Sequence, residues 1–347
     1  RIFVIHFDFA SFFDNIPHDY LRYLLEDENI FLTTELERVL LKQVRQHQYA
    51  EIEEYKRSNF KQRRIGIPQG NTLSLFMANI AAHKLDIELS RQTGEFARFA
   101  DDFICVTKTH AQAENISHVV RSFSQNSFIP INNQKSQGIK LFSEPSPELS
   151  YIDSFKFLGY KFSNEGLDIS DSRKASIKRR CSKIIYVNLL YHLRQYGCIR
   201  PDRIGLKFFD WDLVTCVNEL RRYIYGGLTQ ESIDLHLTDK VNLRRIGGPV
   251  AYFCLVERVD TFRELDGWLV NVLQRAYKER RRILRTLGRR KKLPSQYELI
   301  DGSWYKFSRV PNETVLPSFV SAWRASRKCW KRHGLGGINV PKDIYIY

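Results

Sequence analysis

The chain has 347 residues, of which 43% are hydrophobic, and a formal net charge of +15. This length and apolar content are enough for a substantial core and two or more domains. No apolar run approaches the roughly eighteen residues that span a bilayer, which excludes a transmembrane protein. Six scattered cysteines without a C-x-x-C pair argue against a disulfide framework and predict a soluble, cytoplasmic protein. Because the sequence starts at Arg1 inside a predicted strand and its only methionine is Met77, we expect a fragment of a longer chain.

The positive charge is concentrated in one segment. Residues 273–292 hold ten basic residues and one acidic residue. Such a concentration of positive charge attracts polyphosphate backbones, although a solvated helix face or a patch that binds an anionic membrane would give the same pattern. The 17 Tyr, 23 Phe and 5 Trp offer stacking surfaces and favour nucleic acid as the partner.

Apolar periodicity and Gly/Pro punctuation predict the elements of the first half. The first elements are a strand at 2–9, a turn at 11–18 that leads into a helix from His18, and a helix at 34–49. A Gly/Pro loop at 65–74 then leads into a long helix that includes Leu89, and a hairpin around 98–107 follows. The last elements are a helix at 111–127, a short strand and turn at 129–138, and a hairpin strand at 155–162 with its turn at 164–166. This order predicts an α+β domain, a sheet with helices on one face.

The second half reads as helical. Apolar spacing predicts helices at 173–196, 214–226, 244–258 and 261–287, the third weakened at its start by Gly247, Gly248 and Pro249. We therefore place a domain boundary near residues 166 to 172.

Three aspartates interrupt apolar, β-favouring runs. Asp101 and Asp102 follow Phe99-Ala100, and Asp8 follows the run Ile2–Phe7. Asp is depleted in strands, so the pair predicts a hairpin tip. Three carboxylates supplied by two strands would suit Mg²⁺, which takes few protein carboxylates and leaves positions for water and phosphate. Two unrelated turn clusters would give the same pattern, so these residues alone leave the matter open.

Taken together, the motifs resemble those of reverse transcriptases of the prokaryotic group II intron and retron type. The resemblance runs from Phe7 to about Arg290 and rests on five motifs in order: motif A at 7–18, motif B at 66–70 with Ser74 and Asn79, motif C at 99–102, motif D at 133–136 and motif E at 157–160. Three features depart from the family pattern. Phe99 replaces the usual Tyr of motif C, Leu75 replaces the usual Pro of motif B, and the fingers strands that precede motif A are missing.

The resemblance implies a right-hand polymerase. It assigns a palm with residual fingers to residues 1–166, an all-helical thumb or maturase-like domain to 172–290, and a basic C-terminal extension to 291–347. The palm would be an antiparallel sheet with helices on one face. The family's residues carry over only where this sequence matches its motifs.

The carried-over catalytic group centres on two Mg²⁺ ions, for which Mn²⁺ could substitute. Asp8 and Asp101 would bridge the ions, Asp102 would complete the acidic cluster, and the carbonyl of Phe9 would add a ligand. Lys135 would protonate the leaving pyrophosphate as a general acid, with a surface lysine in a turn as the other interpretation.

The resemblance also assigns substrate contacts. Phe13 would be a steric gate against the ribose 2′-hydroxyl, with ordinary core packing as the alternative. Gln69 and Gly70 would line the nucleotide pocket. The remaining assignments are Phe99 near the primer end, Leu158 and Gly159 in the primer grip, and Arg179, Arg180, Lys183, Arg281, Arg282 and Arg285 at the nucleic-acid backbone.

The implied function is RNA-directed DNA synthesis from dNTPs, with an RNA template or a structured non-coding RNA and a DNA primer as partners. No endonuclease-type Cys/His cluster or RNase H-like acidic set follows. This absence is expected of domesticated relatives that act in antiviral defence. Template-independent or protein-primed synthesis on the same site is one alternative. An RNA-binding maturase without polymerase activity is another, and the sequence leaves an oligomer or accessory protein open.

Overall fold

The computed structural model describes most of the chain. The described residues are 2–27, 34–46, 48–49, 61–62, 64–70, 72–92, 94–136, 138–142, 151–197, 210–289, 292–304 and 314–339. Contacts divide the chain into two compact units, Arg1–Ser154 and Phe155–Tyr347. Each unit has its own hydrophobic core.

The first unit is built on a five-stranded sheet in the order β4-β5-β1-β6-β7. Every neighbouring pair is antiparallel except β6 and β7, which are parallel. The central strand is β1, so both of its edges are hydrogen-bonded. The strand bounds are β1 Ile2–Asp8, β4 Glu95–Phe99, β5 Asp102–Thr107, β6 Gly138–Phe142 and β7 Tyr151–Ile152, and a separate two-stranded sheet joins β2 Gln48–Tyr49 to β3 Lys61–Gln62.

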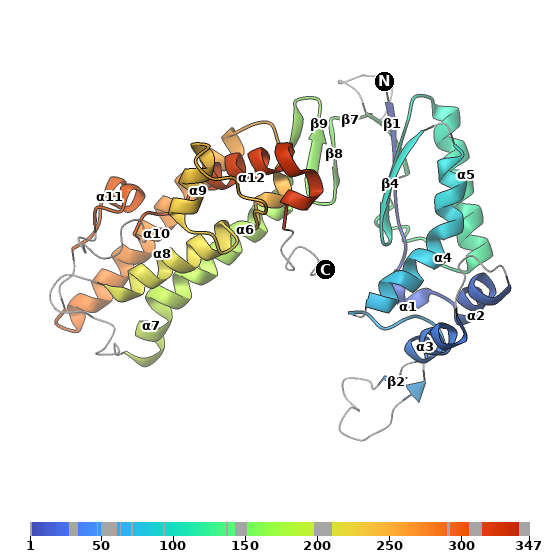
Figure 1. Ribbon diagram of the computed structural model, residues 1–347, viewed down its shortest axis with the longest axis horizontal. Helices are drawn as coiled ribbons and strands as arrows, with labels where there is room; N and C mark the ends of the chain where they lie inside the picture. The colour runs from blue at the N-terminus through green and yellow to red at the C-terminus, as the bar shows by residue number, and fades with distance from the viewer. Residues whose placement is uncertain are drawn as a thin grey trace. The chain divides into compact units, whose positions relative to one another are not determined.

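Helices cover one face of this sheet, and Figure 1 shows α4 and α5 alongside the strands. Side chains alternate between faces along a strand. Ile5 and Phe7 of β1 belong to the core that also holds residues of α4 and α5, which assigns His6 and Asp8 to the opposite face. The helix bounds are α1 Phe12–Asn15, α2 His18–Arg22, a π-helix at Tyr23–Asp27, α3 Glu35–Arg45, α4 Thr72–Ser90 and α5 His110–Ser127.

The second unit combines a small antiparallel sheet with helices. The sheet has the order β10-β9-β8 and joins β8 Ser154–Phe157, β9 Tyr160–Ser163 and β10 Gly166–Ile169. The helical elements are α6 Asp171–Tyr186, a π-helix at Val187–Tyr191, α7 His192–Tyr196, α8 Trp211–Ile224, α9 Gln230–Leu237, a 3₁₀ turn at Ala251–Phe253, α10 Asp260–Thr286, α11 Gln296–Asp301, α12 Phe319–His333 and a 3₁₀ turn at Gly334–Gly337.

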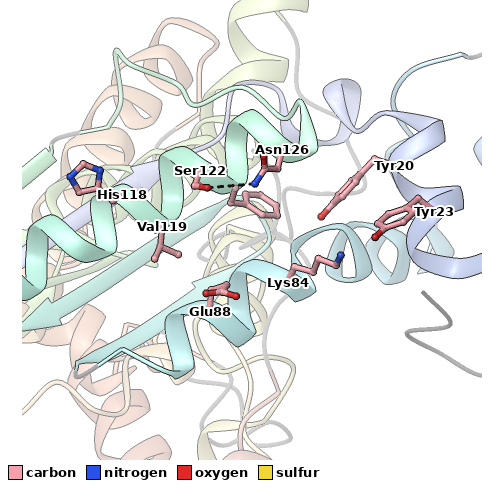
Figure 2. Close-up of a pocket in the computed structure, with 9 residues that line it drawn as sticks. Tyr20, Tyr23, Lys84, Glu88, His118, Val119, Ser122 and Asn126 are labelled. Carbon is pink, nitrogen blue, oxygen red and sulfur yellow. Dashed lines mark hydrogen bonds between the residues drawn. The ribbon is translucent and has the colours of Figure 1, made fainter. Parts of the chain in front are cut away.

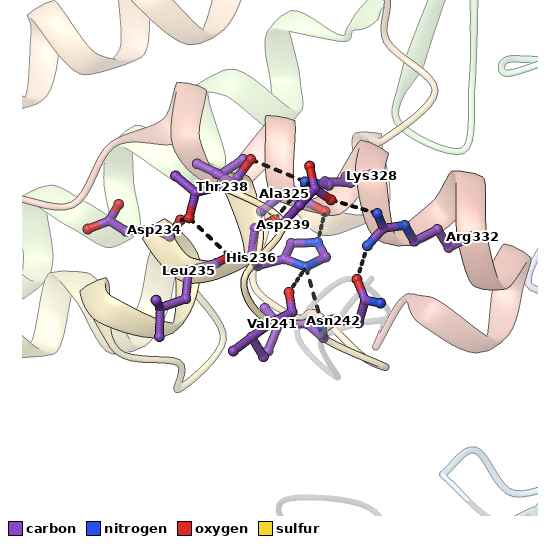
Figure 3. A network of polar contacts seen from close by, with 12 residues as sticks. Asp234, Leu235, His236, Thr238, Asp239, Val241, Asn242, Ala325, Lys328 and Arg332 are labelled. Carbon is purple, nitrogen blue, oxygen red and sulfur yellow. Dashed lines mark hydrogen bonds and ion pairs between the residues drawn. The ribbon is translucent and has the colours of Figure 1, made fainter.

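A polar network joins α9 to α12, as Figure 3 shows. His236 is fully buried; its Nδ1 lies 3.2 Å from both the Leu243 amide and the Val241 carbonyl, and its Nε2 lies 3.3 Å from the Ala325 carbonyl. Lys328 donates to the carbonyls of His236 and Leu237 at 2.8 and 3.1 Å and so caps the C-terminal end of α9. Basic residues of α12 therefore serve the packing of this unit.

The predicted fold class is confirmed: an α+β sheet domain with helices on one face precedes a mainly helical unit. The two contact units divide at residue 154/155, and Tyr160 and Ile169 are buried in the second unit's core. Residues 292–304 and 314–339 also belong to this unit, and Phe319 and Trp323 lie in its core. The palm, thumb and basic extension assigned from the sequence stay predictions.

Two local predictions are wrong. Residues 244–258 form a 3₁₀ turn and irregular backbone instead of a helix, because Gly248 has φ +97° and Gly226 packs against Gly247 with no room for a Cβ. The strand expected within 129–138 is reduced to a single bridge between Ile131 and Phe9, and the strand itself runs over 138–142. Across the described residues, no helix is both long and apolar enough to cross a membrane.

Candidate active site

The three predicted aspartates lie at the same end of two neighbouring strands. Asp8 ends β1 and is the direct partner of Asp102, the first residue of β5, so both side chains leave the same face of the sheet. Asp101 lies in the two-residue turn between β4 and β5. Ala100 precedes it with φ +55°, in the left-handed region that two-residue hairpins use. The predicted hairpin tip is thus present, and it places Asp101 next to the strand pair.

The electrostatics show that these carboxylates interact. Burial is the main cause that raises the pKa of Asp101, and the charges of Asp8 and Asp102 raise it further, while a backbone hydrogen bond and, to a smaller extent, the charge of Lys135 lower it. Desolvation and like charge both disfavour an ionised carboxylate. A cation bound among the three would reverse this penalty.

The loop after α5 holds Asp8. The Asn132 amide donates to Asp8 Oδ2 at 3.2 Å, and the Asn132 backbone N–H donates to the Asp8 carbonyl at 2.8 Å. Lys135 Nζ lies 3.4 Å from Asp8 Oδ2, although the lysine side chain is 70% exposed. Asn132 Oδ1 accepts from the backbone N–H of Gln134 and of Lys135 at 3.1 and 3.2 Å, which fixes the turn that carries the lysine. Lys135 is therefore beside the acidic group.

The side chain of His6 contacts the carboxylate of Asp102. His6 Nε2 lies 2.5 Å from Asp102 Oδ1. It lies on the same face as Asp8 because the two are two positions apart in β1. His6 was not among the residues predicted from the sequence, although the period-two alternation that places Asp8 on this face also places His6 there.

The fit of this site to Mg²⁺ can be judged from its donors. Three carboxylates and nearby carbonyls are the oxygen ligands that Mg²⁺ prefers, and the pKa of Asp101 is raised first by burial and then by the charges of Asp8 and Asp102. Within the described residues, however, no three His, Cys, Asp or Glu side chains are arranged to hold a metal ion. Asp102 turns toward His6 and Asp8 toward Asn132, so a bound ion would have to draw both carboxylates from these partners.

Arg98 fixes the hairpin tip to the long helix. Its guanidinium donates to both carboxylate oxygens of Asp86 in α4, at 2.7 and 2.5 Å, and to the Ala100 carbonyl at 2.9 Å. A bidentate arginine–carboxylate pair has a defined geometry. Arg98 thereby ties the strained residue before Asp101 to α4, a positioning role that the sequence alone does not reveal.

The loop before α4 is bound to the segment that follows β1. The Ile67 N–H donates to the Phe13 carbonyl at 2.7 Å, and the Gly66 N–H donates to the Ile16 carbonyl at 2.8 Å. A Cβ at Gly66 would lie 2.5 Å from the Asp14 carbonyl oxygen, so this close approach requires glycine. The structure thus brings Phe13 next to the predicted nucleotide loop.

The substrate residues differ in exposure. Phe13 is half-buried and contacts the Phe12 ring edge-on, with centroids 5.9 Å apart. Gln69 and Gly70 are exposed in the turn before α4. Phe99 is half-buried opposite Asp102 at the end of β4, whereas the Phe9 side chain is 1% exposed in the core. Only the backbone of Phe9 could take part in binding.

Leu158 and Gly159 belong to the second unit. They form the turn between β8 and β9, with φ +49° and +83°. The Ser170 N–H donates to the Gly159 carbonyl at 2.9 Å, and a Cβ at Gly159 would lie 2.9 Å from the Arg173 side chain. The glycine is thus required where the turn packs against the start of α6.

The predicted nucleic-acid residues fall on two helices of the second unit. Arg179, Arg180 and Lys183 are exposed on α6. On α10, Arg285 is exposed, but Arg282 is paired with Glu279 at 2.9 Å. The sixth residue, Arg281, is partly buried, and its Nε is buried without a hydrogen-bond partner.

A cavity of about 670 Å³ lies in the first unit between the π-helix, α4 and α5. Figure 2 shows Tyr20, Tyr23 and Lys84 at one side of it and His118 at the other. Lys84 Nζ lies 4.9 Å from the centroid of the Tyr23 ring. The lining comes from the helices, and none of the three aspartates contributes to it.

Comparisons with known proteins give one family match. Residues 2–162 match the family model of reverse transcriptase (RNA-dependent DNA polymerase). This range holds all five motifs that resemble that family. No curated protein matches the chain.

Solved telomerase structures show a distant likeness. Telomerase from Candida albicans in complex with a fragment of telomeric RNA is 14% identical, with 81% of this chain and 47% of that chain covered and a TM-score of 0.37. Apo telomerase from Candida tropicalis is 12% identical, with 94% and 48% covered and a TM-score of 0.38. The chain spans less than half the length of these telomerases. The part of the chain that is similar to the reverse transcriptase family model, residues 2–162, carries Asp8, Asp101 and Asp102.

Proposed function

We propose that this chain is an RNA-directed DNA polymerase that extends a DNA primer with dNTPs. One observation carries the proposal: within a reverse transcriptase domain, Asp8 and Asp102 are direct partners on adjacent strands and Asp101 lies in the turn beside them. Nucleotidyl transfer needs such carboxylates where divalent ions meet a triphosphate. We place it in the group II intron and retron-like subgroup on its motif sequences, and we propose antiviral defence as its setting.

We propose that Asp8, Asp101 and Asp102, with the Phe9 carbonyl, hold two Mg²⁺ ions. When bound, Mg²⁺ would promote ionisation of the primer 3′-hydroxyl and neutralise the triphosphate and the leaving pyrophosphate. Lys135, 3.4 Å from Asp8, would balance the acidic charge before binding and then protonate the pyrophosphate. Ion binding would draw Asp102 from His6 and Asp8 from Asn132, so these two contacts would be exchanged for metal contacts.

The second unit supplies the proposed grip on nucleic acid. The turn at Leu158 and Gly159 would support the primer backbone, because a glycine there admits a close approach. Exposed Arg179, Arg180 and Lys183 would contact phosphates of the template, primer or a dedicated structured RNA.

An incorporation assay tests the function. The full natural protein is given an RNA template with a DNA primer, dNTPs and Mg²⁺, and the product is sequenced. We expect DNA complementary to the RNA, and no product with EDTA. Product whose sequence ignores the added RNA would replace the proposal by template-independent synthesis. RNA binding without incorporation in Mg²⁺ or Mn²⁺ would instead indicate a maturase-like RNA-binding protein without polymerase activity.

Replacing Phe13 with Ala tests the sugar gate. The half-buried ring would collide with a ribose 2′-hydroxyl, so we expect its removal to reduce the preference for dNTP over rNTP by roughly 10- to 100-fold. The measurement is kcat/KM for matched dNTP and rNTP. Phe128→Ala, at a 78% exposed ring in the same unit, is the control and should keep the native preference. A Phe13→Ala enzyme with unchanged sugar preference would remove Phe13 from the nucleotide site.

A further inference from the structure

Four exposed rings follow one another along a single helical segment of the second unit. The segment runs through α6, the π-helix at Val187–Tyr191 and α7. Tyr186, Tyr191 and Tyr196 are 40%, 38% and 61% exposed, and His192 is exposed beside them. Centroid distances are 6.2 Å between Tyr186 and Tyr191, 5.7 Å from Tyr191 to His192, and 5.5 Å from His192 to Tyr196. We call these four residues the ring row.

The π-helix creates this row. At 100° per residue, side chains five positions apart in an α-helix would diverge by about 140°. The wider π turn brings Tyr186 and Tyr191 onto one side instead, within ring contact. Single π turns are rare and frequently mark functional sites.

A buried side chain holds the π turn. Arg280 of α10 is 1% exposed and donates to the Leu189 carbonyl, inside the π-helix, at 2.9 Å. The same guanidinium is fixed by Asp210 at 2.7 and 2.9 Å. The turn is therefore braced from the core side while its rings remain at the surface.

Unpaired positive charge continues the row. Arg179 and Lys183 are exposed, and helical spacing places them on the same face as Tyr186. In the part of the chain that the structure describes, neither they nor Arg180 forms a salt bridge. From Arg179 to Tyr196 the segment spans about 25 Å, with cations at one end and rings at the other.

We propose that the ring row together with Arg179 and Lys183 forms a binding surface for single-stranded RNA. Unpaired bases would stack on the exposed rings, which accept any base, while Arg179 and Lys183 neutralise the adjoining phosphates. The phenolic hydroxyls and the imidazole nitrogens at the ring edges can hydrogen-bond ribose 2′-hydroxyls, which favours RNA over DNA. A duplex, with its bases already stacked on one another, cannot use the row.

The experiment measures binding of the full protein to a fluorescent unstructured 12-nucleotide RNA by anisotropy, without dNTPs or Mg²⁺. It is therefore independent of the polymerase activity, and either proposal can fail alone. The double substitution Tyr186→Leu with Tyr191→Leu should weaken binding by about tenfold or more, because bases can no longer stack on these two rings. Tyr186→Phe with Tyr191→Phe keeps the rings and should retain most of the affinity.

Two further arms complete the test. Tyr297→Leu, at a 74% exposed tyrosine on α11, is the control and should bind like the unchanged protein. Lys183→Gln should make the slope of log affinity against log salt concentration shallower by about one unit, because about one counterion fewer is released on binding. Equal affinity of the Leu double variant and the control would overturn the proposal. Equal loss of affinity for single-stranded RNA and for a matched duplex would overturn it too, as would preference for single-stranded DNA.

Discussion

Replacing Asp101 with Asn is expected to lower dNTP incorporation by roughly 10³-fold or more. A divalent ion stabilises transition-state charge by several kcal/mol, and each 1.4 kcal/mol is a factor of ten in rate. Asp101 lies in the turn beside the Asp8–Asp102 pair, so its loss removes an oxygen ligand shared by the proposed ions. Steady-state incorporation on an RNA template measures the effect.

The same substitution should leave the fold intact or slightly stabilised. The pKa of Asp101 is raised by burial and by the neighbouring carboxylates, so at neutral pH its ionised form is disfavoured and a neutral Asn relieves that cost. Thermal unfolding therefore separates a catalytic defect from misfolding. Asp19→Asn, at an exposed aspartate that pairs with Arg22, should keep full activity. Appreciable synthesis by the Asp101→Asn protein would refute the site assignment.

The substitution Arg280→Met is expected to cost about 3–5 kcal/mol of unfolding free energy. Arg280 is 1% exposed and donates to Asp210 and to Asp212, the latter at 2.8 Å. Removing one partner of a buried ion cluster leaves uncompensated buried charge, which is the expensive outcome. Denaturant unfolding of the full chain gives the free-energy difference.

The neighbour Arg282 provides the control. It is exposed and pairs with Glu279 at i, i+3, so Arg282→Met should cost below about 1 kcal/mol. A substitution at Arg280 as mild as the one at Arg282 would show that the buried cluster contributes little. Because Arg280 also holds the Leu189 carbonyl, its loss should loosen the π turn and weaken RNA binding by the ring row.

The sequence predicted the elements that depend on local pattern. The hairpin around Asp101, the long helix α4 and the end of β1 at Asp8 all follow from apolar alternation and periodicity. The helix expected at 244–258 failed because Gly226 and Gly247 pack backbone to backbone, a contact between residues about twenty apart that no local pattern displays. The sequence did not predict helix α12, in which basic residues alternate with the apolar ones and one of them, Lys328, donates to a carbonyl at the end of α9.

Asp8, Asp101 and Asp102 stood out in the sequence because carboxylates are unusual in strand surroundings, and their role at the site stays a prediction. The His6 contact with Asp102 and the Arg98 contact with Asp86 depend on strand register and on the packing of α4. Likewise, Arg280 and Arg282 are the same residue type in one basic run, and only the fold makes one a buried anchor and the other a surface charge.

The central position of β1 has a consequence for synthesis of the protein. Its two neighbours, β5 and β6, begin at Asp102 and Gly138, so β1 must wait until about a hundred more residues have been made before it can pair. Long-range pairing of this kind is slow and leaves strand edges open meanwhile. On the ribosome, Asp8 would therefore leave the exit tunnel long before its carboxylate partners exist, and the nascent apolar strand Ile2–Phe7 is where a chaperone would bind.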